Sequence, residues 1–262
     1  MINFKAYIKA KKQYLETLTD DNAIFIYQMG KVGSTSLENS VENAVHIHAF
    51  YAKNHTCKVR QAGLDKFGLR SLIYRAERTL FEFLARKAFK RRTQTKIVTL
   101  IRKPEERNMS MFFHDIDAYL FSAHTNCIST RKRPIPTRSQ STALLTKVYD
   151  EEFDHYYPLN WYANEFEPMT GVDVFSQPFN KEKGYNIIEQ DNVSVLCIRT
   201  DKLNDLIPVL EAFIGQCVNI KNDNKAESKW YSEIYRNFKN EYELPKAVKH
   251  KLKNSQFYQH FF

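Results

Sequence analysis

"IFIYQMGKVGSTSLENSV", residues 24–41, joins an apolar run to a glycine-containing loop and then to residues that favour a helix. The whole chain has only seven glycines, and two of them, Gly30 and Gly33, lie on either side of Lys31. A strand, a tight loop and a helix present free backbone N–H groups and the positive end of a helix to a phosphate. The stretch therefore predicts an anion-binding loop, with an ordinary strand-to-helix turn as the structural alternative.

Three further segments resemble strands of the same sheet. Residues 43–51, "NAVHIHAFY", alternate in polarity, which places His46 and His48 on one face. Residues 96–101 and 193–198 are short continuous apolar runs, which are typical of buried parallel strands. Because strands alternate with helical stretches, we predict an α/β fold with a doubly wound parallel sheet, whose ligand crevice lies at the C-terminal ends of the strands.

The rest of the chain is mainly helical in pattern. We expect an N-terminal helix at 3–18, a long and increasingly basic helix at 61–92, and a C-terminal helical segment at 229–262. Residues 122–142 lack periodicity and predict a mobile basic loop. No repeat or domain boundary is visible, so we expect a single domain over residues 1–262. The apolar side of the long helix consists of Leu69, Leu72, Ile73, Leu80, Phe83 and Leu84.

Composition limits the partners and the compartment. The formal charge of +9 favours an anionic partner such as a nucleotide, an acidic polysaccharide, a nucleic acid or a membrane surface. The four cysteines form no CxxC pair, so we expect neither a zinc site nor a disulfide framework. The N-terminus lacks the apolar core of a signal peptide, and no segment approaches the roughly 20 apolar residues of a membrane span. We therefore expect a cytoplasmic protein, with peripheral contact at the inner face of the membrane as a further expectation.

The loop differs from the nucleoside-triphosphate motif GxxxxGK[ST], because Lys31 precedes Gly33 instead of following the last glycine. No predicted strand ends in an acidic residue that could support magnesium. Instead "LIRKPEERNMS", residues 100–110, ends a strand with Arg102 and places Arg107 and Ser110 on the next helix. Two anion sites without a metal-binding acid predict a nucleotide that carries phosphate at two separate positions.

These motifs resemble those of sulfotransferases that use 3′-phosphoadenosine-5′-phosphosulfate (PAPS). "KVGSTSL" is similar to their 5′-phosphosulfate loop, and "RKPEERNMS" is similar to their 3′-phosphate motif, an arginine with a serine eight positions later. "KWYSEIYRNF" at 229–238, with the segments at 160–174 and 178–185, resembles a bacterial group of capsular polysaccharide synthesis proteins. That group is named for a Lys-Trp-Tyr-Ser motif and is similar to sulfotransferases. The resemblance covers about residues 23–240.

The resemblance implies a P-loop-containing, three-layer sulfotransferase-like fold and transfer of a sulfuryl group from PAPS to a carbohydrate hydroxyl. The acceptor would be a capsular or other surface polysaccharide or a glycolipid, and no metal is expected. Lys31 would stabilise the leaving phosphate, because developing charge is best met by preorganised donors. The residues implied to bind the donor are Lys31, Gly33, Ser34, Thr35, Ser36, Arg102, Ser110 and Lys229.

Sulfuryl transfer to an alcohol also needs a base to accept the hydroxyl proton. Histidine is mostly neutral at cell pH and can accept a proton. We choose His48 as the base and His46 as the second candidate, with Glu38 and His114 as the next two. The structural alternative is that both strand histidines are simply packed or surface side chains.

Other functions compete with this prediction. Asp115 and Asp117 form a DxD pair that suggests a metal-dependent glycosyltransferase, although a single helix over 111–121 would make their side chains diverge. A nucleotide kinase is disfavoured by the position of Lys31. The net charge alone would fit a non-enzymatic binder of an anionic polymer, yet no nucleic-acid-binding motif accompanies it.

The aromatic C-terminal motif and the runs of basic residues give two further expectations. The helical spacing of Trp230 with Ile234 and Phe238 favours a core position for Trp230 and for Tyr231. A run of cations could guide an acidic acceptor toward the site, although such a run is more often a solvated face. That run consists of Arg86, Lys87, Lys90, Arg91, Arg92 and the arginines at 131–138.

Overall fold

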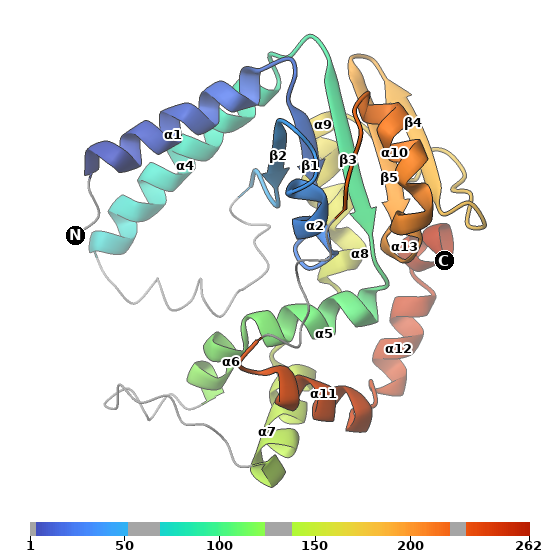
Figure 1. Cartoon of the computed structure of the whole chain (residues 1–262). Helices are drawn as coiled ribbons and strands as arrows, with labels where there is room; N and C mark the ends of the chain where they lie inside the picture. Colours follow the sequence, from blue (N-terminus) through green and yellow to red (C-terminus); the bar gives the residue numbers. More distant parts are fainter. Residues whose placement is uncertain (1–3, 52–68, 124–137, 221–228) are drawn as a thin grey trace.

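The strands β1 to β5 of the computed structural model form one sheet in the order β2-β1-β3-β5-β4 (Figure 1). The structure describes residues 4–51, 69–123, 138–220 and 229–262, and this sheet lies within them. Most of the predicted basic loop at 122–142 lies outside the described residues, and its last residues, from Arg138, begin a helix. The strand bounds are β1 Ile24–Tyr27, β2 Ala44–Ile47, β3 Thr95–Ile101, β4 Tyr185–Gln190 and β5 Val193–Arg199.

The sheet is mostly parallel, which corrects the prediction of an entirely parallel one. β1, β2, β3 and β5 run in the same direction, as their sequence patterns indicated. β4 pairs with β5 in antiparallel orientation, from Tyr185 opposite Ile198 to Gln190 opposite Val193. Only Asp191 and the residue after it separate these two strands, and Asp191 has a φ of 51°. A two-residue connection with positive φ makes a tight hairpin, which requires antiparallel strands.

The order of the strands in the sheet reverses at β1. β2 lies on one side of β1, and β3, which follows in sequence, lies on the other side. In an open α/β sheet, such a reversal of strand order brings the loops after the two neighbouring strands together at their C-terminal ends. The glycine-containing loop after β1 and Arg102 after β3 are therefore placed at the same edge of the sheet.

Helices lie on both faces of the sheet, with α10 on one face and α8 and α9 on the other (Figure 1). α5 begins as predicted, with Pro104 in its first turn and two glutamates after it. The helix bounds are α1 Phe4–Thr19, α2 Ser34–Glu38, α4 Leu69–Phe89, α5 Pro104–His114, α6 Ile116–Ala123, α7 Arg138–Glu151, α8 Tyr157–Trp161, the π-helix η3 Tyr162–Phe166, α9 Glu167–Thr170, the 3-10 helix η4 Thr200–Leu206, α10 Ile207–Ile214, α11 Ser232–Glu241, α12 Lys246–Lys253 and α13 Gln256–Phe261.

The buried side chains form two clusters. The larger cluster fills the sheet and its covering helices, where Tyr27 packs against Phe50 and Phe166. The smaller cluster is aromatic and joins α5, α6, α7 and α11, with Phe112 in contact with Tyr149. These four helices lie beyond the C-terminal ends of the strands (Figure 1). The second cluster therefore supports a helical layer at the edge where the loops meet.

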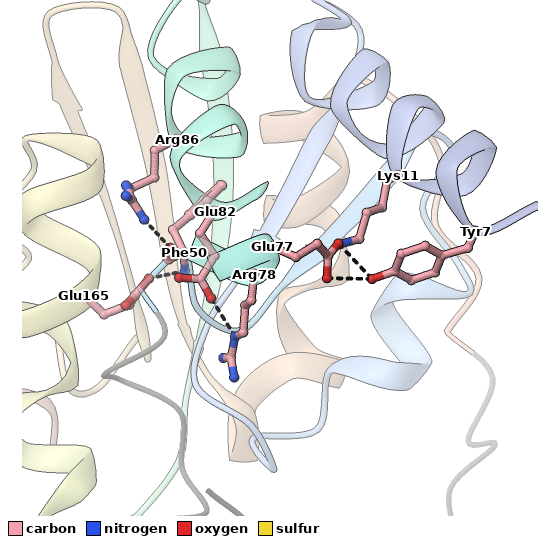
Figure 2. A network of polar contacts seen from close by, with 8 residues as sticks. All are labelled: Tyr7, Lys11, Phe50, Glu77, Arg78, Glu82, Arg86 and Glu165. Atoms are coloured by element: carbon pink, nitrogen blue, oxygen red, sulfur yellow. Dashed lines mark hydrogen bonds and ion pairs between the residues drawn. The ribbon is translucent and has the colours of Figure 1, made fainter. Parts of the chain in front are cut away.

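Polar contacts attach α1 and α4 to each other and α4 to the sheet. Glu77 accepts a hydrogen bond from Tyr7 and forms an ion pair with Lys11 (Figure 2). Farther along α4, Arg86 donates to the carbonyl of Phe50 at 2.8 Å. The predicted apolar side of this helix does not join the core, because Leu72, Ile73, Leu80, Phe83 and Leu84 are all exposed. None of the helices in the described ranges is long and apolar enough to cross a membrane.

Candidate active site

The loop after β1 has a backbone that only part of the sequence pattern explains. Lys31 has a φ of 71° and Gly33 a φ of 98°, whereas Gly30 has no positive φ. A Cβ at position 33 would also lie 3.2 Å from Cγ2 of Thr200, while one at position 30 would meet Met111 Sδ only at 3.8 Å. Glycine is thus required at position 33 but not at position 30. The left-handed conformation of Lys31 is strained, and such strain is concentrated at functional sites.

Three polar side chains hold this loop from outside. Nη1 of Arg102 donates to the carbonyl of Lys31 at 3.3 Å, and Nε of Arg107 donates to the carbonyl of Gly30 at 3.0 Å. The hydroxyl of Thr200 donates to the carbonyl of Val32 at 2.8 Å. The end of β3, the helix α5 and the start of η4 therefore fix the conformation of the loop.

Positive charges converge on Lys31. Burial and, after it, the charges of Lys229, Arg102 and Arg107 together lower the pKa of the Lys31 ammonium to about 8, while Asp115 acts in the opposite direction. Cations that lower the pKa of Lys31 repel its ammonium, so the charge of Lys31 is poorly compensated by the protein itself. Such a field is suited to a multiply charged anion.

Arg107 is the most deeply buried of these cations. The sequence placed it beside Arg102 and Ser110 in the second anion site, but the resemblance did not include it among the donor-binding residues. Its side chain is 1% exposed, and its guanidinium lies over the ring of Tyr157 at 4.8 Å. Burial lowers its pKa to about 10. Nη1 donates to Asn108 Oδ1 at 3.1 Å, but Nη2 is buried without any hydrogen-bond partner. A buried donor without a partner costs free energy unless a ligand satisfies it.

The other predicted donor-binding residues are placed as follows. Arg102 is half-buried and also pairs with Glu106, with 3.3 Å between Nε and Oε2. Ser110 is half-buried on α5, the helix that carries Arg107. Gly33 precedes the first turn of α2, in which Thr35 is exposed and Ser36 is half-buried. Ser34 begins that helix, but its side chain is outside the described part.

The two histidines at β2 lie together. Nδ1 of His46 is 2.8 Å from Oε2 of Glu38, and the ring centroids of His46 and His48 are 4.2 Å apart. His48 follows the last residue of β2, and its Nδ1 lies 3.1 Å from the carbonyl oxygen of Gln28. The structure therefore joins the first, second and third candidates for the base into one group beside the loop.

The contact with Gln28 determines the tautomer of His48. A carbonyl oxygen only accepts hydrogen bonds, so Nδ1 carries the proton in the neutral ring and Nε2 keeps its lone pair. The side chain is exposed by accessible area, yet enough protein surrounds the ring for desolvation to be the largest cause of a lowered pKa, with the charge of His46 as the next. His48 can therefore act as a proton acceptor through Nε2.

The acidic pair does not lie within one helix, which corrects the expected helix over 111–121. α5 ends at His114, the fourth candidate for the base, which is exposed. Asp115 follows as the buried C-terminal cap, and Asp117 lies in the first turn of α6. Among the residues that the structure describes, no three His, Cys, Asp or Glu side chains gather as a group that could hold a metal ion.

The Lys-Trp-Tyr-Ser segment forms the turn before α11. Tyr231 is buried and packs against Phe113, as expected, but Trp230 is 58% exposed and is not a core residue. Lys229 is close enough to Lys31 for its charge to lower the pKa of Lys31. The turn thus brings a cation from the C-terminal part of the chain to the loop after β1.

Residues 138–262 match a family model described as "Putative capsular polysaccharide synthesis protein". The match covers slightly less than half of the chain, from α7 to the C-terminus, and includes Lys229. Lys31, Arg102 and His48 lie outside it. No curated protein and no solved structure gives a significant match. The match is consistent with a polysaccharide-related role.

The predicted run of cations on α4 is mostly used inside the protein. Arg86 contacts the backbone of Phe50, and Arg92 is buried and donates to the carbonyl of Leu18 at 3.3 Å. Lys90 is exposed and donates to the carbonyl of Pro168, in the first turn of α9, at 3.2 Å. These three residues are therefore structural cations, which removes most of the described part of the run as a guide for an acidic acceptor.

Proposed function

We propose that this chain is a sulfotransferase that moves a sulfuryl group from PAPS to a hydroxyl of a carbohydrate acceptor. The acceptor class, a capsular or related surface polysaccharide or a glycolipid, is supported by the family match of the C-terminal half. The observation that carries the proposal is the convergence of Lys31, Arg102, Arg107 and Lys229 where β1 and β3 end.

An anion would remove two energetic penalties at this place. It would favour the charged form of Lys31, whose pKa is lowered to about 8 in the protein alone. It could also accept a hydrogen bond from the unpartnered Nη2 of Arg107. Arg102 lies at the end of β3 and Ser110 farther along α5, which supports a second phosphate on the same ligand. A nucleotide with phosphate at both the 5′ and the 3′ position, such as PAPS, fits this division.

The chemistry requires one bond to form and one to break. In the proposed reaction an acceptor hydroxyl oxygen attacks sulfur, and the bond between sulfur and the 5′-phosphate oxygen breaks. The electron pair remains on that phosphate oxygen, where the ammonium of Lys31 stabilises the charge. The hydroxyl proton moves to Nε2 of His48, whose Nδ1 proton is held by the Gln28 carbonyl. The products are a sulfate ester and 3′-phosphoadenosine-5′-phosphate.

The proposal is tested by mixing the protein with PAPS and surface glycans and measuring release of 3′-phosphoadenosine-5′-phosphate together with mass gain of the glycan. We expect glycan-dependent release that Lys31→Ala and His48→Gln each lower by roughly a hundredfold or more. Lys253→Ala, which removes an exposed lysine on α12, is the matched control and should retain activity. Transfer from a nucleotide sugar, with none from PAPS, would instead establish the glycosyltransferase alternative.

A further inference from the structure

One side of α4 exposes large apolar side chains to solvent. The exposed fractions are 60% for Leu72, 63% for Ile73, 60% for Leu80, 53% for Phe83 and 41% for Leu84. Their spacing of one, seven, three and one residues places them within a single stripe along the helix. A side chain that is about half exposed in each of five such positions is unusual on a protein surface, and a contiguous apolar patch marks an interaction site.

Other side chains of α4 already make contacts within the protein. Phe81 packs against Tyr14 of α1, with 5.8 Å between the ring centroids, and Phe89 is buried against the sheet. Glu77 is paired with Lys11. The other glutamate of the described helix, Glu82, is half-buried and forms an ion pair with Arg78 of the same helix at 2.8 Å (Figure 2). In the described part of α4, the apolar stripe therefore carries no free carboxylate.

Cations and a further apolar side chain accompany the stripe. Lys87, one turn beyond Phe83, and Arg91, just after the helix, are exposed. On the adjacent α1, Lys9 and Ile8 are exposed, Ile8 by 49%, and the exposed Lys12 lies 3.7 Å from Oε1 of Glu16. The α1–α4 pair extends away from the sheet (Figure 1). An apolar stripe beside lysines and arginines is the pattern of helices that lie in a membrane interface.

We propose that the apolar face of α4, with α1 beside it, docks on an anionic membrane surface. Leu72, Ile73, Leu80, Phe83 and Leu84 enter the interface between headgroups and acyl chains, and the cations pair with lipid phosphates. This docking does not depend on the reaction proposed above.

Charge distinguishes a membrane from a second copy of the chain. Self-association through this face would bring Lys87 and Arg91 of one copy toward a surface that carries the same cations, in a protein of net charge +9. Because the two α4 glutamates described above are held in ion pairs, they do not offset this repulsion. Anionic headgroups supply the missing negative charge, and each cation near such a surface contributes to binding.

The test is flotation of the full chain with vesicles of phosphatidylcholine alone or with one third phosphatidylglycerol. We expect binding to the anionic vesicles that weakens as salt rises, and little binding to the neutral ones. Leu80→Gln combined with Phe83→Gln should weaken it at least about tenfold. The matched control is Ile187→Gln, which changes an exposed apolar side chain on β4, 39% accessible, and should leave binding unchanged.

Three results would overturn the proposal. The first is no binding to anionic vesicles, and the second is equal loss of binding in the Ile187→Gln control. The third is a dimer in sedimentation velocity that the Leu80/Phe83 double variant dissociates, which would assign the face to a second copy. Thermal unfolding of the double variant should match that of the unmodified protein, because both side chains are exposed.

Discussion

Replacing Lys31 by Met should make the protein more stable while removing its ability to bind an anion. Methionine keeps an unbranched side chain, one heavy atom shorter, and removes the charge. The positive φ at this position is present in both proteins, so backbone strain cancels. The charged ammonium is disfavoured in the folded state by burial and by Lys229, Arg102 and Arg107. Its removal therefore relieves a cost that the unfolded chain does not have.

The magnitude follows from the pKa. A displacement from 10.5 to about 8, at about 1.4 kcal/mol for each pKa unit, sets a ceiling of roughly 3.5 kcal/mol. Lys31 is only partly buried, so solvent screening reduces the expected gain to about 1.5 kcal/mol. Below pH 8 the folded protein carries the full cost. Between pH 8 and 10.5 the unfolded state binds more protons, so the stability of the unmodified protein rises relative to that of the variant.

Urea unfolding at pH 7 and at pH 10 measures both parts of this prediction. Lys31→Met should raise the free energy of unfolding at pH 7, and most of the gain should be lost at pH 10. Lys253→Met, at an exposed position on α12, controls for the general effect of removing a lysine. A variant that is less stable at pH 7, or a difference that does not change with pH, would show that the protein itself compensates these cations and would refute the reasoning.

Three further predictions concern the same half of the molecule. Gly33→Ala should destabilise by about 1–2 kcal/mol because of its φ of 98°, whereas Gly30→Ala should change stability by less than about 0.5 kcal/mol; equal effects in urea unfolding would contradict this. Glu165→Ala should lower the free energy of unfolding by about 3 kcal/mol, because this buried carboxylate accepts hydrogen bonds from the Tyr27 hydroxyl at 2.6 Å and from the backbone N–H of Phe50. A loss of less than about 1 kcal/mol in urea unfolding would contradict this role of Glu165. The rate of sulfuryl transfer should fall with acid only below pH 6.5, because the pKa of His48 is lowered, and His46→Gln should move that fall to higher pH; a rate profile unchanged in the variant would exclude the coupling.

Sequence patterns predicted the strands that are buried on both faces of the sheet better than the strand at its edge. Within the predicted runs at 96–101 and 193–198, residues 97–101 and 195–198 are buried on both faces of the sheet, so the continuous apolar runs were sufficient to predict these strands. β4, at 185–190, is an edge strand with one buried residue, and its mixed composition gave no such signal. The break between α5 and α6 was also missed, because residues 111–121 keep helical propensity across Asp115.

The candidate site was predictable in its local parts and not in its assembly. The positions of Lys31 and Arg102 follow from strand ends, which a single sequence reveals. The proximity of Lys229 to Lys31 depends on how the C-terminal helices pack, and no local pattern encodes it. Arg107 was visible as a basic residue on α5, but only the fold shows that its side chain is buried and reaches the loop. The exposure of Trp230 and of the α4 stripe was likewise invisible, because helical spacing alone does not say which apolar side is covered.

The central claim is that the cations at the ends of β1 and β3 bind a nucleotide through two separate phosphates. Calorimetric titration with 3′-phosphoadenosine-5′-phosphate, with ADP as the comparison, tests it most directly. The account predicts micromolar binding that requires the 3′-phosphate and is lost in Lys31→Ala and in Arg102→Ala, while Lys253→Ala binds normally. Equal binding of ADP, or no binding of either nucleotide, would contradict it.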